Sequence, residues 1–241
     1  MKPELRPRLP WSRIIPGLCL DVFYRRKRDF LADCRAMEAK LGPRARVTGM
    51  ENIPSSGPLV IVANHLQGPG LWIGWPVALA TAAVARARGD FTHWLVSVDY
   101  DRDSVEGAKK LIPGTRWAFA RVAHAWSMIP VDPQKPGGAA RGLLQLVREG
   151  KVAGVFPEGA VQGLKDGLHD PQPTAMRLLV RAAASGAVLL PVAFAVEGGT
   201  LTCAFLRPEA SAEAAWRSVT RALAERGMDV ALVAGQQSRP R

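Results

Sequence analysis

A histidine stands two residues after a short apolar run in this chain of 241 residues. The run Leu59–Ala63 has the length and composition of a buried strand, and Asn64 and His65 come immediately after it. An imidazole titrates near neutral pH, so His65 has the chemistry of a general base placed at the end of a strand. A single histidine in this position also suits a structural or surface role, and neighbouring motifs must decide between the two.

A glutamate stands in a tight turn after a second apolar run. Val152–Phe156 is followed by Pro157, Glu158 and Gly159. Proline cannot extend a strand ladder, and glycine permits backbone torsions that other residues avoid. We therefore expect the strand to stop here and to present one carboxylate at its end. Taken alone, the same corner would also suit an exposed glutamate.

The elements that must position these side chains alternate between strands and helices. Strands are expected at 46–49, 59–63, 92–98, 128–131, 152–156, 188–196 and 201–206. Helices are expected at 71–84, 115–126, 139–148, 171–184 and 209–226. This order predicts an α/β fold with a single mixed sheet flanked by helices, in which Pro191 would be awkward for a central strand. Ligands in open α/β sheets bind at the carboxyl ends of strands, where His65 and Glu158 stand.

The first 44 residues are expected to form an N-terminal region ahead of an α/β domain over residues 45–241. We predict a flexible arm and then one basic amphipathic helix over Trp11–Leu41. Its apolar residues precede the basic cluster Tyr24–Arg28, a combination that suits the headgroup region of a membrane surface. The alternative is a surface helix whose apolar side packs on the domain. Neither a signal peptide nor an apolar run long enough to span a bilayer is evident.

The net charge indicates the kind of partner, and the cysteine content bears on metal sites and on the cellular compartment. The formal net charge of +11 favours anionic partners such as a lipid surface, an acidic co-substrate or nucleic acid. The sequence has no recognition-helix motif, zinc pattern or aromatic–basic platform, which argues against nucleic acid. Its three cysteines have neither metal-ligand spacing nor a paired framework, so we expect no metal site and a reducing cytosolic compartment.

Two strands that end in Asn-His and Phe-Pro-Glu-Gly, in this order, form a rarer pattern than either motif alone. The pattern resembles the glycerolipid (lysophospholipid) acyltransferase family, which includes 1-acylglycerol-3-phosphate acyltransferases. That family carries Asn-His-x4-Asp, an Arg-bearing segment, Phe-Pro-Glu-Gly-Thr and an apolar strand with Pro-Val. Here Asn64-His65, Phe156–Gly159 and Leu190–Val192 match, and the resemblance covers about residues 45–205.

The resemblance implies transfer of a fatty acyl group from an acyl thioester to the hydroxyl of a lipid. The donor would be acyl-CoA or an acyl-carrier protein, with no metal and no bound cofactor. His65 would be the general base, and Asn64 would help to hold the loop or the oxyanion. The acceptor pocket would be formed by Phe156, Pro157, Glu158 and Gly159. The protein would be cytoplasmic and peripheral on the inner face of the membrane.

Several polar positions of the family pattern are replaced together in this chain. Counting from His65, the family's aspartate, which orients the imidazole and stabilises its cation, falls on Gly70. Pro133 stands where the family's phosphate-binding arginine would be. Ala160–Gln162 replaces the usual Thr-Arg-Ser. The resemblance is therefore strong for the fold and weak for an acceptor that carries a phosphate.

Two interpretations of these departures remain. The first is an acyltransferase with an altered acceptor, such as one lacking a phosphate, in which Asp99 or Asp101 supports His65 from the end of the next strand. The second is a catalytically silent relative that binds lipid or acyl chains without turnover, which the loss of the aspartate at Gly70 favours.

Overall fold

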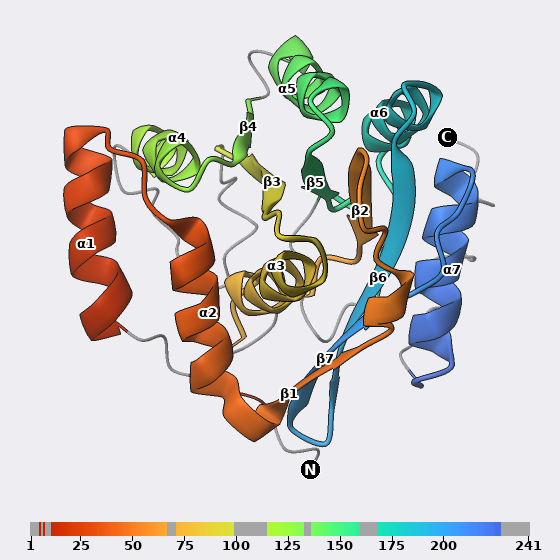
Figure 1. The fold of residues 1–241 in the computed structure, drawn as a ribbon, viewed down its shortest axis with the longest axis horizontal. Coiled ribbons are helices and arrows are strands. Elements are labelled where there is room, and N and C mark those ends of the chain that lie inside the picture. Colours follow the sequence, from red (N-terminus) through yellow and green to blue (C-terminus); the bar gives the residue numbers. More distant parts are fainter. Residues whose placement is uncertain are drawn as a thin grey trace, which may run out of the picture.

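The computed structural model describes residues 5, 7, 11–66, 71–98, 115–132, 136–159 and 168–227. Most of the expected N-terminal arm and the last residues, 236–241, lie outside the described residues. The described strands form one seven-stranded sheet in the order β1-β7-β6-β2-β5-β3-β4 (Figure 1). They are β1 (Ala45–Thr48), β2 (Leu59–Ala63), β3 (Thr92–Ser97), β4 (Ile129–Val131), β5 (Val152–Val155), β6 (Val188–Glu197) and β7 (Thr200–Phe205). The pair β6–β7 is antiparallel and the other neighbours are parallel, so the predicted mixed sheet is confirmed.

Helices lie on both faces of this sheet (Figure 1). They are α1 (Trp11–Tyr24), α2 (Phe30–Leu41), α3 (Gly74–Arg88), α4 (Thr115–Ala125), α5 (Pro136–Arg148), α6 (Pro173–Ala184) and α7 (Ala212–Ala224). One core contains Trp75 of α3 and Phe194 of β6, together with residues of α2. The second core contains Leu143 of α5 and Trp216 of α7, together with residues of α6. The α/β architecture expected from the sequence is therefore a three-layer arrangement.

The two strands that lead to the candidate site lie in the middle of the sheet. β2 is hydrogen-bonded to β6 on one side and to β5 on the other. Every residue of β2 and β5 is buried. Strands covered by helices on both faces bury both rows of side chains, which explains why their sequences are continuous apolar runs rather than alternating ones.

Pro191 lies in β6, a central strand, and its position explains why the sheet tolerates it. On one side it pairs with Val62 of β2. On the other side β7 ends at Phe205, and the N–H of Leu206 donates to the Pro191 carbonyl at 2.9 Å. The hydrogen bond that proline cannot donate is thus missing only at the end of the antiparallel ladder.

The prediction of one helix over Trp11–Leu41 is wrong, because α1 and α2 are separated by residues 25–29. Arg25 has φ 56°, a left-handed conformation that ends the first helix. Asp29 begins the second by accepting a hydrogen bond from the Ala32 N–H at 2.9 Å, a typical N-cap. The basic residues at 25–28 therefore lie in a connection and not on the face of a helix.

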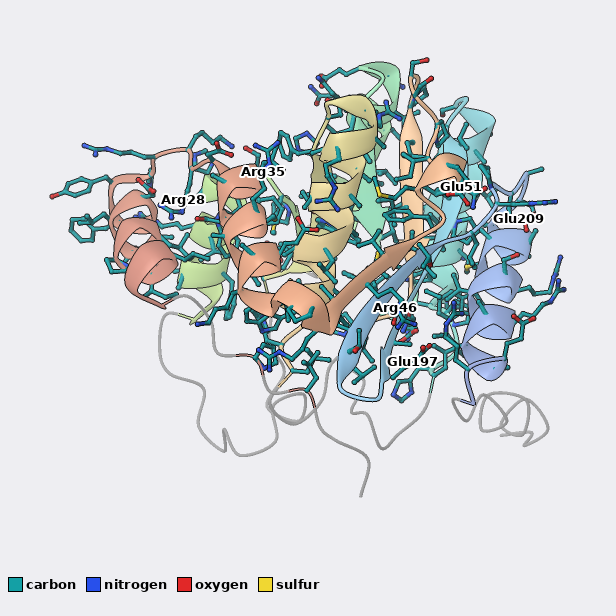
Figure 2. The ribbon with its side chains drawn as sticks, turned by 60° about the horizontal axis from the view of Figure 1, so that its bottom comes forward. Arg28, Arg35, Arg46, Glu51, Glu197 and Glu209 are labelled. Carbon is teal, nitrogen blue, oxygen red and sulfur yellow. The ribbon has the colours of Figure 1, made fainter. Side chains whose placement is uncertain are left out.

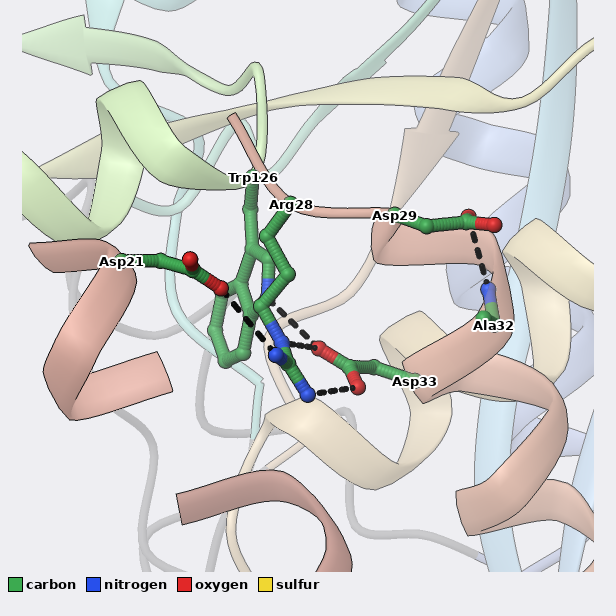
Figure 3. Close-up of polar contacts among 6 residues, drawn as sticks. All are labelled: Asp21, Arg28, Asp29, Ala32, Asp33 and Trp126. Atoms are coloured by element: carbon green, nitrogen blue, oxygen red, sulfur yellow. Dashed lines mark hydrogen bonds and ion pairs between the residues drawn. The ribbon is translucent and has the colours of Figure 1, made fainter. Parts of the chain in front are cut away.

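One member of the basic cluster is engaged in a network that ties this region together (Figure 3). Arg28 donates to both carboxylate oxygens of Asp33, from Nε at 2.6 Å and from Nη2 at 2.8 Å. Its Nη1 also donates to Asp21 at 3.2 Å. Trp126, just after α4, donates its Nε1–H to Asp33 at 2.9 Å. The hydrogen bond from Asp33 raises the pKa of Arg28 despite the burial that opposes it.

The surface of α1 divides into a packed side and an exposed side. Ile14 and Leu18 are buried in the core that includes α2 and α3. Leu20, Phe23 and Tyr24 are exposed near its end, with Phe23 67% exposed. Figure 2 shows Arg28 beside α1 and α2, far from Arg46 and Glu197. Within the part of the chain that the structure describes, no helix has both the length and the apolar character needed to cross a membrane.

Candidate active site

The loop tips that follow β2 and β5 meet at one edge of the sheet. The two strands are parallel neighbours with Val62 opposite Val155, so both run toward the same edge (Figure 1). The imidazole of His65 packs against the ring of Phe156, with ring centroids 5.0 Å apart and an interplanar angle of 72°. The juxtaposition expected from the two motifs is therefore present in the structure.

The His65 ring lies in a largely apolar environment. Its Nδ1 is buried and has no hydrogen-bond partner among the described residues. Burial disfavours the charged imidazolium and lowers the pKa of His65 to about 4. The ring is consequently neutral at physiological pH, which is the protonation state that a general base requires.

The side chain of Asn64 bonds the backbone of β6. Its Oδ1 accepts from the N–H of Phe194 at 2.8 Å, and its Nδ2 donates to the Phe194 carbonyl at 3.0 Å. Both contacts are buried, and they continue the pairing of β2 with β6 one residue beyond the end of β2. Asn64 thereby holds the loop that carries His65, and its predicted contact with substrate stays a prediction.

The Pro-Glu-Gly corner is a closed turn anchored to α6. The N–H of Gly159 donates to the Phe156 carbonyl at 3.1 Å, and Gly159 has φ 65°. This left-handed torsion is strained for residues with a Cβ, and a Cβ here would also lie 3.1 Å from the side chain of Gln172. The carbonyl of Pro157 accepts from the N–H of Gln172 at 2.8 Å. The glycine is needed for the shape of the turn.

Glu158 points into the protein, contrary to the interpretation of the turn as an exposed corner. Its side chain is 0% exposed, and neither carboxyl oxygen has a hydrogen-bond partner among the described residues. Burial raises the pKa of Glu158 to about 9. The backbone of His65 is close to the carboxyl group without meeting hydrogen-bond geometry, and it only partly opposes this shift. At neutral pH the residue is therefore a neutral acid that can donate a hydrogen bond, and not the carboxylate expected from the sequence.

The raised pKa predicts that Glu158→Gln stabilises the protein. A glutamate whose pKa rises from 4.5 to about 9 takes up a proton on folding, so its cost grows as the pH rises above the unfolded value. Glutamine has a similar shape and carries no such cost. We expect the free energy of unfolding to rise by about 3 kcal/mol at pH 7, and by less than about 1 kcal/mol at pH 5.

Urea denaturation of both proteins at the two pH values measures this difference. Glu149→Gln, which changes an exposed glutamate at the end of α5, is the matched control and should leave stability nearly unchanged. Equal stability of wild type and Glu158→Gln at pH 7 would mean that the folded protein holds Glu158 as a paired carboxylate, contradicting the neutral acid.

The sequence did not single out Trp94, which backs the aromatic side of the site. The Trp94 and Phe156 rings are stacked at 4.9 Å with an interplanar angle of 17°. Trp94 also donates its Nε1–H to the hydroxyl of Thr81 on α3 at 3.0 Å. It lies across Gly154 of β5, where a Cβ would come within 2.3 Å of the indole. The glycine inside an apolar strand was the available signal, because such a residue marks a close approach.

Other predicted positions lie outside the described residues: Asp99, Asp101, Gly70, Pro133 and the stretch 160–162. The support of His65 by Asp99 or Asp101 therefore stays a prediction. Within the described ranges, no group of three or more histidine, cysteine, aspartate or glutamate side chains is placed to hold a metal ion.

No family model and no curated protein matches this chain. Among solved structures, the 1-acyl-sn-glycerophosphate (LPA) acyltransferase PlsC from Thermotoga maritima is similar to it, with a TM-score of 0.52 and 18% sequence identity. The match covers 90% of this chain and 90% of that chain. At this identity the likeness shows the fold alone. The chain thus shares the fold of an acyltransferase, in agreement with the fold expected from its sequence motifs.

Proposed function

We propose that this protein is an acyltransferase that moves a fatty acyl group from an acyl thioester to the hydroxyl of a lipid acceptor. The observation that carries the proposal is the meeting of His65 with the Phe156–Gly159 turn at the ends of β2 and β5. These are the two motifs by which the sequence resembles glycerolipid acyltransferases. The likeness of fold to PlsC is consistent with this function.

The proposed reaction starts from the neutral form of His65. Neutral His65 takes the proton of the acceptor hydroxyl as its oxygen attacks the thioester carbonyl. The tetrahedral intermediate then collapses, the C–S bond breaks, and the departing thiol sulfur receives the proton from the imidazolium. Glu158, a buried neutral acid beside the backbone of His65, shapes the wall of the acceptor pocket without reaching the lipid. The donor is the thioester of CoA or of a carrier protein.

The proposed acceptor is a lipid alcohol without a phosphate. Pro133 and Ala160–Gln162 replace the positions at which the resembling family carries an arginine and the Thr-Arg-Ser sequence. The described part of the site consists of a neutral imidazole, a neutral carboxylic acid and aromatic rings. Such surroundings suit an uncharged acceptor better than a phosphate.

We propose further that the protein acts as a peripheral protein on the cytoplasmic face of a membrane. Leu20, Phe23 and Tyr24 of α1 are exposed, as is Trp117 of α4, which packs beside α1. The exposed basic residues 25–27 follow directly. Exposed aromatics beside basic side chains favour contact with anionic headgroups.

A second candidate function is that of a silent relative that binds lipid without turnover. The unpartnered Nδ1 of His65 favours it, since among the described residues no carboxylate orients the imidazole or stabilises its cation. In serine proteases, replacing the aspartate that supports the catalytic histidine lowers kcat by a factor of about 10⁴. An enzyme with an unsupported histidine is accordingly expected to be slow.

The test is thioester consumption by the purified protein, with acceptors presented in vesicles that contain anionic lipid. Acyl-CoA and acyl-carrier protein are each combined with a neutral monoacylglycerol and with 1-acylglycerol 3-phosphate, and the acylated lipid is identified by mass spectrometry. Acylated product from the neutral acceptor supports the proposal. Lipid binding with no thiol release from either donor would establish the silent relative instead.

A further inference from the structure

Three aromatic rings form a continuous row of contacts, the aromatic stack, on one face of the sheet. The imidazole of His65 meets Phe156 edge to face at 5.0 Å, and Phe156 stacks on Trp94 at 4.9 Å. The residues come from, or directly follow, β2, β5 and β3, which are neighbours in the sheet. Because Trp94 lies opposite Gly154 and Phe156 is two residues further on, both rings project from the same face.

The far end of the stack is fixed in place. Trp94 is 1% exposed, and its Nε1–H is bonded to the fully buried Thr81 hydroxyl of α3 at 3.0 Å. The indole occupies the space that a side chain at position 154 would fill. A buried ring held by a hydrogen bond on one edge and by packing on its face has little freedom to tilt. Phe156 is stacked on this indole, so the tilt of its own ring is restricted as well.

At the near end of the stack, one nitrogen of the His65 ring has no hydrogen-bond partner among the described residues. The Nδ1 of His65 is unpartnered, so no hydrogen bond of that nitrogen fixes the plane of the imidazole. The titratable group placed against this residue is Glu158, which contacts its backbone. The ring of Phe156 packs against the imidazole and is a contact that can restrict how the imidazole is turned.

We propose that Trp94 and Thr81 are positioning residues which, through Phe156, set the orientation of the His65 ring for proton transfer. This inference rests on the proposed function, in which His65 is the base. The stack thus supplies part of the orientation that a carboxylate gives a histidine base elsewhere.

Thr81→Val tests this proposal with little change of volume, because it removes the acceptor of the Trp94 hydrogen bond. We expect kcat to fall about tenfold with KM within about twofold. Thr81 is buried behind Trp94 and is not placed to contact substrate, whereas proton-transfer geometry is sensitive to small displacements. Thr81→Ser restores the hydroxyl and should recover kcat. Trp216→Phe, which trims a buried indole in the opposite core, is the matched control and should leave kcat unchanged.

NMR of histidine-labelled protein gives a readout that does not depend on turnover. Thr81→Val and Trp94→Phe should each shift the ring signals of His65, and Trp216→Phe should not. If both variants lower the melting temperature but leave the His65 signals and the kcat of folded protein unchanged, Trp94 and Thr81 are merely structural and the proposal is overturned. If the wild type transfers no acyl group, the proposed function fails, and the NMR shifts alone decide whether the stack orients the ring.

Discussion

Replacing His65 with alanine is expected to lower kcat by a factor of about 10² to 10⁴, the usual contribution of a positioned general base, or roughly 3 to 5 kcal/mol of barrier. In the proposed function, the attacking hydroxyl would then have no side chain placed to take its proton. The lowered pKa of His65, about 4, keeps the ring in its basic form throughout the neutral range. The rate of thiol release, measured at saturating donor and acceptor, gives kcat directly.

Two controls make this result specific to the base. His124→Ala removes an exposed histidine of α4 and should leave kcat within about twofold. His65→Gln retains a polar side chain of similar size that cannot accept a proton at neutral pH, and it should be as impaired as His65→Ala. Activity that is unchanged in His65→Ala would exclude this residue as the base, whatever the fold of the protein.

Asp33→Ala is expected to lower the free energy of unfolding by about 3 kcal/mol or more, which is the usual cost of removing one partner from a buried ion pair. The Asp33 carboxylate accepts two hydrogen bonds from Arg28 and one from Trp126 (Figure 3). Its side chain is 7% exposed and that of Arg28 is 17% exposed. The substitution would leave a guanidinium and an indole N–H without their main acceptor in a poorly hydrated place.

Glu38→Ala provides the comparison, because Glu38 lies on the same helix in an ion pair with Arg86 at 2.6 Å that is far more exposed. Exposed pairs of this kind contribute about 0 to 1 kcal/mol, so this variant should be nearly as stable as the wild type. Urea denaturation followed by circular dichroism measures both variants. If the two substitutions cost the same, the network around Asp33 is as weak as a surface ion pair and does not hold α1 and α2 in place.

Local sequence signals predicted the elements and the turn chemistry of the candidate site. The apolar runs at Leu59–Ala63 and Val152–Phe156 correspond to β2 and β5, although β5 ends one residue earlier, at Val155. The Pro-Glu-Gly sequence forms a closed turn with a left-handed Gly159. These features depend on residues close together in the chain, so they can be inferred from spacing and residue type. The same is true of the N-cap at Asp29, a signal that was present in the sequence and was missed.

The contacts that define the site depended on tertiary packing. Nothing in the order of the chain required β5 to lie between β2 and β3, yet that order brings His65, Phe156 and Trp94 into one stack. The protonation of Glu158 likewise depends on burial among residues that are distant in sequence. The sequence alone determined which residue types stand at the ends of which strands. Strand order, register and burial, which arise from long-range packing, decided which of them touch and which of them are neutral.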